Sequence, residues 1–296
     1  MRLSNPKSVH PQTSRHPLRS CHSSCPKGLN TVFSVAALFL PLGFSGLGEE
    51  APNGENKNEN KITDRRPTYG YRRVLQLLNI ELKRLKKSTV NHKRIYRIMK
   101  ASGLLLQRHT GKPNRTHDGK VITLHSDTRW CSDSFVIQCW NADRVHIAFS
   151  LDTCDREAIR YVASTIGVDG AMIRDLMVES IEARFGSPQA PKRVQWLTDN
   201  GPAYIARETV EMARRLNLDP CTTPSYSPES NGMAEAFVKT FKRDYVWHAD
   251  LSSAVTVMGQ LNQWFDDYNE TAPHKGLKML SPRQFRRVMA EQKSTG

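Results

Sequence analysis

The sequence predicts an α/β domain that follows a small helical region. From Arg129 onward, three strand-like runs precede helix, strand, helix, strand and helix patterns, an order typical of a sheet covered by helices. Before them, residues 66–104 repeat apolar side chains at helical spacing. A chain of 296 residues is long enough for two modest domains, one of them with a sizeable core.

The positive charge of the chain lies in one block. The formal net charge is +14, and residues 61–130 hold 18 Lys and Arg against 4 Asp and Glu. Residues 1–60 hold 6 against 4, and residues 131–296 hold 19 against 21. A basic block beside a slightly acidic domain favours a nucleic-acid-binding region attached to a separate core. The alternative is a basic surface that is only solvated.

Residues 1–60 do not have the pattern of a folded domain. No acidic residue precedes Glu49, and the apolar run 32–40 is too short to span a bilayer, although it resembles the h-region of a signal peptide or part of a transit peptide. We expect this segment to be disordered or a misassigned start, ending in a polar linker. Residues 107–125 are basic and rich in turn residues, and we expect a flexible linker there.

The helical region, residues 61–106, is expected to hold two packed helices. The first carries one apolar stripe, formed by Val74, Leu78, Leu82 and Leu85. In the second, the residues expected to be buried are Ile95, Ile98 and Met99.

The second helix also presents a cationic face. Asn91 is its expected N-cap and Gly103 its expected stop. Lys93, Arg97 and Lys100 follow one another at helical spacing. A short helix with such a face, packed on a partner helix, is typical of helix-turn-helix modules, so these three residues are candidate DNA-phosphate contacts. An ordinary solvated face is the open alternative.

Each element of the α/β domain, residues 126–290, has its own signal in the sequence. Runs rich in β-branched and aromatic residues predict strands at 130–139, 145–151, 160–166, 194–198 and 218–222. Helical periodicity predicts helices over 170–185, around 210–216, from about 235, and over 257–268.

Acidic residues stand where an α/β sheet places functional groups. The apolar run 194–197 ends in Asp199 and a turn dipeptide, so this carboxylate lies at the carboxyl end of a buried strand. Glu235 lies just inside a helix, with 35 residues between it and Asp199. Asp133 lies on the first strand.

These motifs resemble a known family. LTDNGP at 197–202, SPESNGMAEAFVKTFK at 227–242 and the spacing of thirty-five are similar to the DD(35)E core of bacterial insertion-sequence transposases. The likeness is to the IS-three family, in particular its IS-two-like second-frame protein, and more distantly to retroviral integrases. RWCSDSFVIQC at 129–139 resembles the first-strand element of the family, and SPRQF at 281–285 its C-terminal signature. The resemblance covers about residues 66–287.

The resemblance implies a ribonuclease H-like integrase core, a mixed five-stranded sheet with flanking helices, preceded by a small helix-turn-helix-like domain. It implies cleavage at insertion-element ends followed by 3′-hydroxyl strand transfer. It also implies that Asp133, Asp199 and Glu235 are the catalytic residues and hold two Mg²⁺ ions, or Mn²⁺ in their place, with Asp133 shared. Two such ions clamp the attacking and leaving oxygens of a phosphodiester, and Mg²⁺ prefers oxygen ligands.

Two of these assignments have rivals. Asp152, in the run LDTCDR at 151–156, competes with Asp133, although its plain interpretation is turn hydrogen bonding. Lys239 and Lys242 follow Glu235 at i+4 and i+7 on one helix face. The resemblance implies that these lysines contact terminal DNA. The alternative is that a lysine neutralises the glutamate across one turn.

The implied partner is double-stranded DNA, at both the element ends and the target. The resemblance implies a homo-oligomer on DNA, or a chain fused to or paired with an upstream-frame protein. We expect no membrane association and a bacterial, cytoplasmic, nucleoid-associated location, because a secreted enzyme would not meet its DNA. Two alternatives stay open: a non-catalytic DNA-binding remnant, which the unusual N-terminus favours, and a related ribonuclease H-like nuclease.

Overall fold

The computed structural model describes residues 62–107, 123–223 and 232–294. The expectations for residues 1–60, and for most of the linker at 107–125, lie outside the described residues. In the ranges that the structure describes, no helix combines the length and the apolar character needed to cross a membrane.

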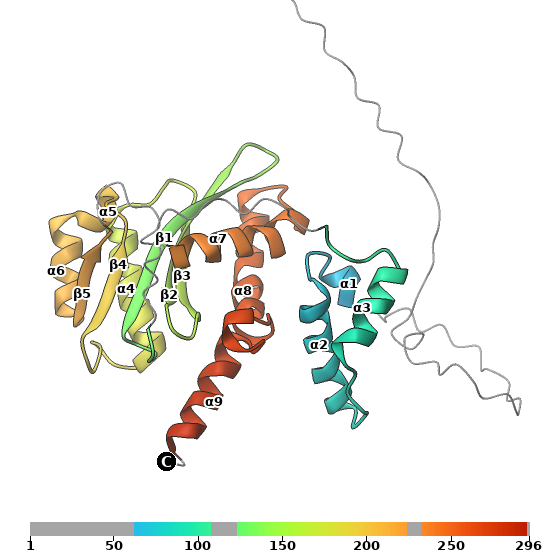
Figure 1. The fold of residues 1–296 in the computed structure, drawn as a ribbon. Coiled ribbons are helices and arrows are strands. Elements are labelled where there is room, and N and C mark those ends of the chain that lie inside the picture. Colours follow the sequence, from blue (N-terminus) through green and yellow to red (C-terminus); the bar gives the residue numbers. More distant parts are fainter. Residues whose placement is uncertain (1–61, 108–122, 224–231, 295–296) are drawn as a thin grey trace, which may run out of the picture. The chain divides into compact units, whose positions relative to one another are not determined.

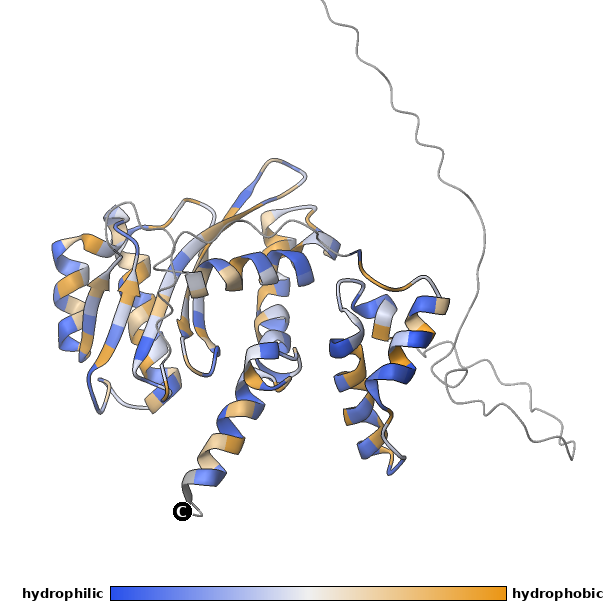
Figure 2. Ribbon diagram, in the orientation of Figure 1, coloured by the Kyte–Doolittle hydropathy of each residue, from blue (hydrophilic) through white to orange (hydrophobic). Residues whose placement is uncertain are grey.

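The helical region folds as three helices (Figure 1): α1 (Ile62–Arg65), α2 (Tyr71–Arg84) and α3 (His92–Ala101). Figure 2 shows hydrophobic and hydrophilic residues alternating along α2 and α3, as expected of amphipathic helices. The predicted stripe is confirmed for Val74, Leu78 and Leu82, which are buried. It is wrong for Leu85, which is 51% exposed because α2 ends at Arg84 and Leu85 forms its C-cap.

Both predicted ends of α3 are confirmed. The side chain of Asn91 accepts a hydrogen bond of 3.0 Å from the backbone N–H of Arg94, as an N-cap does. Gly103 follows the helix with a φ of +68°, a left-handed conformation that glycine adopts without strain. The predicted burial is confirmed for Ile95 and Met99, whereas Ile98 is only half-buried.

The α/β domain is built on a mixed five-stranded sheet with the order β3-β2-β1-β4-β5. Its strands are β1 (Arg129–Gln138), β2 (Arg144–Asp152), β3 (Ala158–Ser164), β4 (Val194–Thr198) and β5 (Leu218–Thr222). β1, β2 and β3 pair antiparallel, whereas β1 with β4 and β4 with β5 pair parallel. The predicted sheet is therefore confirmed, with β3 beginning and ending two residues earlier than expected.

Helices cover both faces of the sheet. One face carries α4 (Gly170–Phe185), α5 (Pro202–Ile205) and α6 (Arg207–Arg215). The other carries α7 (Gly232–Asp244) and α8 (Ala254–Glu270). Short 3₁₀ turns follow at η3 (Val246–His248) and η4 (Lys275–Leu277), and α9 (Pro282–Ser294) was not predicted from the sequence.

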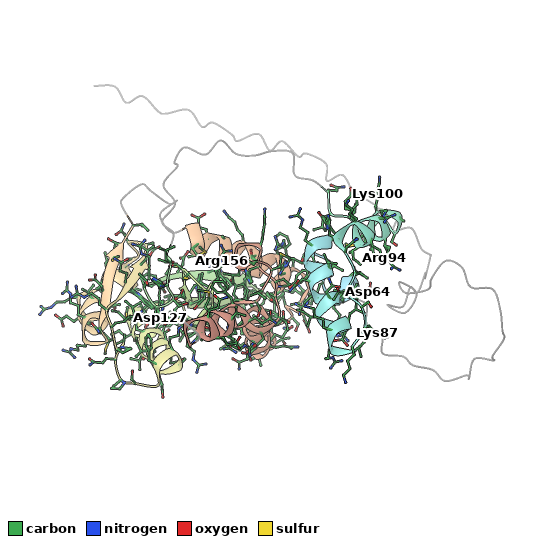
Figure 3. The ribbon with its side chains drawn as sticks, turned by 60° about the horizontal axis from the view of Figure 1, so that its bottom comes forward. Asp64, Lys87, Arg94, Lys100, Asp127 and Arg156 are labelled. Atoms are coloured by element: carbon green, nitrogen blue, oxygen red, sulfur yellow. The ribbon has the colours of Figure 1, made fainter. Side chains whose placement is uncertain are left out.

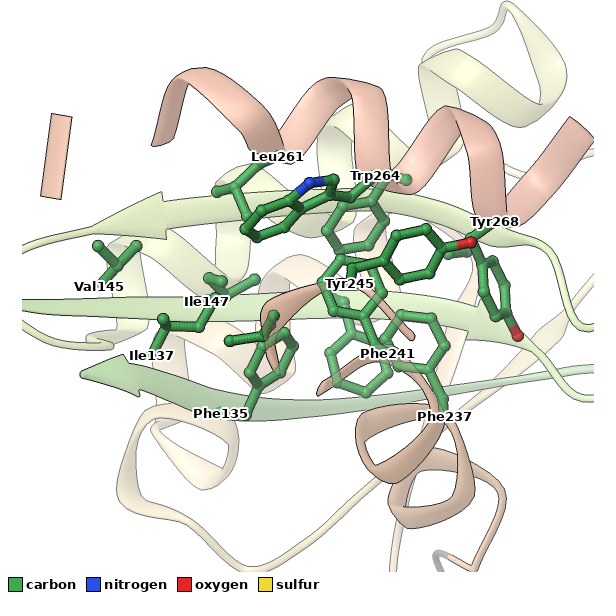
Figure 4. Close-up of a cluster of buried hydrophobic side chains, with 14 of the residues drawn as sticks. Phe135, Ile137, Val145, Ile147, Phe237, Phe241, Tyr245, Leu261, Trp264 and Tyr268 are labelled. Atoms are coloured by element: carbon green, nitrogen blue, oxygen red, sulfur yellow. The ribbon is translucent and has the colours of Figure 1, made fainter. Parts of the chain in front are cut away.

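Aromatic side chains fill the core beneath α7 and α8. Figure 4 shows side chains from β1 and β2 meeting side chains from these two helices. The ring centroids of Phe149 and Phe237 lie 4.5 Å apart, and those of Phe241 and Phe265 lie 4.6 Å apart. Aromatic pairs at such distances stabilise a core by about 0.5–1.5 kcal/mol each beyond area burial. This packing fixes α7 on the sheet, and α7 carries Glu235 in its first turn.

A buried arginine joins α4 to the turn between β2 and β3. Arg184 forms ion pairs with four carboxylates: Asp127 at 2.6 Å, Asp155 and Glu157 at 2.5 Å, and Asp152 at 3.5 Å. Glu157 also receives Arg283 and Arg286 from α9. The cluster therefore holds α9 against the sheet. The residues involved are too far apart in the sequence for a local pattern to predict this contact.

Candidate active site

Asp133 lies on β1, and Asp199 directly follows β4, the parallel neighbour of β1. In the register between β1 and β4, Cys131 lies opposite Leu197. This is the last pair of the register: Asp133 lies two residues beyond it on β1, and Asp199 lies two residues beyond it, just past the end of β4. Adjacent strands are about 4.8 Å apart, and level residues on them point to the same face of the sheet. The sheet therefore brings these two predicted residues together.

The turn after β4 holds the carboxylate of Asp199 in place. The backbone N–H of Gly201 donates a hydrogen bond of 3.0 Å to Asp199 Oδ1. A Cβ atom at position 201 would lie only 3.0 Å from the same oxygen, so glycine permits this close approach. The side chain of Asn200 donates to the carbonyl oxygen of Thr223 at 3.0 Å, which anchors the turn to the end of β5.

Glu235 lies on the same face of the sheet as the two aspartates. Phe135, two residues beyond Asp133 on β1, packs with the α7 residues Phe237 and Phe241 in one core. Because side chains alternate along a strand, Asp133 also points to the side of α7. Glu235, in the first turn of α7, is 41% exposed at its side chain.

The three carboxylates influence one another electrostatically. Burial raises the pKa of Asp133, the backbone N–H of Ser134 opposes that rise, and the charges of Asp199 and Glu235 raise the pKa further. Within the described ranges, no group of three or more His, Cys, Asp or Glu side chains is drawn tightly enough to form a ready metal site. The carboxylates are therefore close enough for Asp199 and Glu235 to act on Asp133, but they are not arranged around one metal position.

The residues present fit a divalent cation. All three candidate ligands are carboxylates, and oxygen is the ligand type that Mg²⁺ prefers. A cation among them would relieve the repulsion that raises the pKa of Asp133. In the structure, the cation that neutralises Glu235 is Lys239, whose Nζ lies 3.3 Å from its carboxylate. In this structure, Lys239 thus forms the i,i+4 ion pair with Glu235 that was the alternative to a DNA contact.

Lys242 points elsewhere. Its Nζ lies 5.6 Å from the centroid of the Phe135 ring, within reach of a cation–π interaction. Since Phe135 follows Asp133 on β1, Lys242 is held over the strand that carries the first aspartate.

Asp152, the rival of Asp133, has a structural role. It is fully buried, and its carboxylate accepts the backbone N–H groups of Asp127 at 2.7 Å, Cys154 at 2.7 Å and Asp155 at 3.1 Å. The predicted interpretation of turn hydrogen bonding is confirmed. Its carboxylate belongs to the cluster around Arg184, and the turn and the arginine together occupy its oxygens.

The cationic face of α3 is solvent-exposed. Lys93, Arg97 and Lys100 are all exposed, and Arg94 is exposed beside them. Figure 3 shows Arg94 and Lys100 on this helix. These side chains are therefore accessible to a DNA phosphate backbone. Exposure is expected both for DNA contacts and for an ordinary solvated face, so it does not separate the two interpretations.

Sequence reasoning missed one hydrogen bond next to the site. The hydroxyl groups of Ser132 and Tyr204 lie 3.2 Å apart, and both residues are buried. The sequence offered one signal for this bond: Ser132 directly precedes Asp133, and Tyr204 directly follows the turn that contains Asp199. No local pattern indicates that residues 72 positions apart bond to each other.

Comparison with known families and proteins gives consistent matches. Residues 124–228 and 217–282 each match a family model described as an integrase core domain, and residues 60–112 match one described as an HTH-like domain. The chain is similar to an uncharacterized protein of insertion element IS136 from Agrobacterium fabrum, with 48% identity over 62% of this chain and 96% of the relative. It is also similar to transposase InsD of insertion element IS2 from Escherichia coli, with 44% identity over 76% of this chain and 75% of the relative. Among solved structures, the catalytic core domain of BIV integrase matches with a TM-score of 0.40 and 17% identity, over 57% of this chain and 99% of that one.

Proposed function

The chain belongs to the family of insertion-element transposases with an integrase catalytic core, and from this premise we propose how it acts on DNA. It cuts DNA at the ends of an insertion element and joins the freed 3′-hydroxyl to target DNA. The observation that supports this proposal is that Asp133 and Asp199 each lie two residues beyond the last pair of the adjacent parallel strands β1 and β4, with α7, which carries Glu235, packed on the same face as Phe135. In this proposal the helical region, residues 61–106, binds DNA, and residues 126–290 carry out the reaction.

The three carboxylates are proposed as ligands of two Mg²⁺ ions, with Mn²⁺ as a substitute. Asp133 would serve both ions, and Asp199 and Glu235 would serve one each, as the resemblance implies. When bound, the ions neutralise charge on the reacting phosphate and activate the attacking oxygen. The contribution of the protein is to hold the ligands in place, through the Gly201 N–H bond to Asp199 and the aromatic packing of α7.

Positive side chains are proposed to hold the DNA. Lys93, Arg97 and Lys100 on the exposed face of α3 contact phosphates away from the reaction. Lys239, which pairs with Glu235, and Lys242, which lies over β1 near Phe135, contact the terminal phosphates of the element. A metal ion at Glu235 would weaken the ion pair of this residue with Lys239, because both cations bind the same carboxylate.

The proposed assembly follows from the reaction. Two element ends and a target duplex must meet, so we propose a homo-oligomer on DNA, or a chain fused to or paired with an upstream-frame protein. The substrate places the reaction in the bacterial cytoplasm, at the nucleoid.

The test is a cleavage and joining assay on DNA that carries the element ends, with Mg²⁺ or Mn²⁺. The wild type is compared with Glu235→Gln, which keeps the shape of the side chain and removes its charge. Glu211→Gln is the matched control, because Glu211 also forms an i,i+4 ion pair, with Arg207 on α6. We expect nicking and joining that depend on metal, vanish in Glu235→Gln and survive in Glu211→Gln.

Other results point to the alternatives. Cut products without joined products indicate a ribonuclease H-like nuclease. DNA binding without cleavage, in the presence of the upstream-frame protein, indicates a non-catalytic remnant. Activity that survives in Glu235→Gln overturns the assignment of this glutamate.

A further inference from the structure

The backbone pairing between the two aspartate-bearing strands stops just before the aspartates. The parallel register of β1 with β4 runs from Arg129 to Cys131 on β1 and ends opposite Leu197. Asp133 and Asp199 lie two residues beyond this last pair. At Asp133 and Asp199, backbone pairing between β1 and β4 therefore no longer sets the distance between the two chain segments.

A side-chain hydrogen bond joins the two segments at that point. Ser132 follows the last register pair, and its hydroxyl lies 3.2 Å from that of Tyr204. Tyr204 belongs to α5, which begins directly after the turn that contains Asp199 and Gly201. Ser132 is 0% exposed and Tyr204 is 7% exposed, so water does not compete for this bond.

The bond lies behind the site rather than in it. Side chains alternate along β1, so Ser132 points away from the face that Asp133 occupies, into the core that contains Trp196 and Tyr204. Burial raises the pKa of the Tyr204 hydroxyl, the bond to Ser132 opposes this, and the charges of Asp133 and Asp199 raise it further. The phenol therefore stays neutral at physiological pH and stays close to both aspartates.

We propose that the Ser132–Tyr204 hydrogen bond sets the separation of Asp133 and Asp199, and that Tyr204 is thereby a positioning residue of the metal site. The proposal rests on the proposed function, since it assumes that these two aspartates hold the metal. Tyr204 touches neither metal nor substrate in this scheme. It acts through the strand that precedes Asp133 and the turn that follows Asp199.

The same face of the sheet offers a matched control. Ser150 on β2 is the register partner of Ser132 and is also 0% exposed. Its hydroxyl bonds that of Ser180 on α4 at 2.7 Å and also accepts the backbone N–H of Arg160 on β3 at 3.2 Å, so its removal is at least as disruptive to packing as that of Ser132. The Ser150–Ser180 pair is thus a buried hydroxyl pair of the same kind, but it joins no segment that carries a proposed metal ligand.

The experiment measures Mn²⁺ binding to the full chain without DNA, by the electron paramagnetic resonance signal of free Mn²⁺, together with the thermal unfolding temperature. The variants are Tyr204→Phe, Ser132→Ala, the double variant, Ser150→Ala and Asp199→Asn. We expect Tyr204→Phe and Ser132→Ala each to weaken Mn²⁺ binding about five-fold, which converts to about 1 kcal/mol, the net contribution of one hydrogen bond. The double variant should bind no more weakly than Ser132→Ala, because Tyr204→Phe then removes a bond that is already lost.

The controls separate positioning from general loosening. Ser150→Ala should lower the unfolding temperature by a similar amount but bind Mn²⁺ as the wild type does. Equal loss of Mn²⁺ affinity in Ser150→Ala and Tyr204→Phe would overturn the positioning role. So would wild-type affinity in Tyr204→Phe, provided that Asp199→Asn abolishes binding. If wild-type binding is absent or survives Asp199→Asn, the proposed metal site itself is wrong and the inference falls with it.

Discussion

Lys239 donates a hydrogen bond of 3.3 Å to the carboxylate of Glu235, one helical turn before it on α7. The pair is solvent-exposed, with 78% of the lysine side chain and 41% of the glutamate side chain accessible. Because Glu235 is also the proposed metal ligand, the lysine and the metal compete for one carboxylate.

Replacing Lys239 by Gln is therefore expected to strengthen metal binding and weaken binding to element-end DNA. The gain in Mn²⁺ affinity should be at most about five-fold, since exposed ion pairs contribute about 0.2–1 kcal/mol. Titration with Mn²⁺ and a DNA-binding assay measure the two effects. Arg207→Gln, which breaks the i,i+4 pair on α6, should change neither. Weaker Mn²⁺ binding in Lys239→Gln would contradict this competition.

Asp133→Asn is expected to stabilise the metal-free fold while removing metal binding. Burial and the charges of Asp199 and Glu235 raise the pKa of Asp133, so its ionised form destabilises the native state above that pKa. The stability that this group contributes is present at low pH and lost as pH rises through the raised pKa. The variant should gain about 0.5–2 kcal/mol at pH 7–8, the range typical of such substitutions.

Thermal unfolding in EDTA checks this prediction. The gain should shrink as pH falls toward the range in which wild-type Asp133 takes up a proton. Asp175→Asn, at an exposed position on α4, should stay within about 0.5 kcal/mol of the wild type. A lower unfolding temperature for Asp133→Asn at pH 8 would show that this carboxylate is not under repulsion.

Arg184→Met is expected to destabilise the protein by about 3–5 kcal/mol, because it leaves buried carboxylates without their common cation. Burial and the neighbouring Asp155 raise the pKa of Asp152 to about 7, and Arg184 limits that rise. Without the arginine, the pKa of Asp152 should rise further, so the variant loses more stability at pH 8 than at pH 5. Urea unfolding at the two pH values measures the difference. An equal loss at both would contradict the assignment of the charge cluster.

Alanine at Lys93, Arg97 or Lys100 is expected to weaken DNA binding in a salt-dependent way. Each phosphate contact that is lost should lower the slope of log affinity against log salt concentration by about one. Fluorescence anisotropy at several salt concentrations measures the slope. Lys192→Ala, at an exposed position in the loop before β4, is the control. An unchanged slope in all three variants would leave the cationic face of α3 as ordinary solvated surface.

Much of the fold could be predicted because its signals are local. The β-branched and aromatic runs of β1, β2 and β4 lie in the sequence, as do the Asn91 cap and the left-handed Gly186 that ends α4. The predicted burial of Leu85 was wrong because the apolar spacing continues to position 85, whereas α2 ends one residue earlier, at Arg84. Local patterns thus gave the five strands and the main helices but missed α9.

The remaining features depend on contacts between distant residues. The docking of α9 rests on Arg283 and Arg286 meeting Glu157, more than a hundred positions away. The preference for Asp133 over Asp152 rests on the register between β1 and β4 and on the hydrogen bonds that Asp152 receives. A single sequence shows which residues are present, but it does not show which distant residues pair with each other.

The register between β1 and β4 aligns two indoles just before the two aspartates, and these indoles can report optically on the site. Trp130 and Trp196 are opposite each other on β1 and β4, three residues before Asp133 and Asp199. Both are buried, with ring centroids 6.5 Å apart, whereas Trp140 and Trp247 are largely exposed. The fifth indole, Trp264, is buried in the core beneath α8. With Trp264 and the two exposed indoles replaced by phenylalanine, the emission would come from the boundary between these strands. A shift of that emission to longer wavelength would then show water entering where the strands separate, without any label.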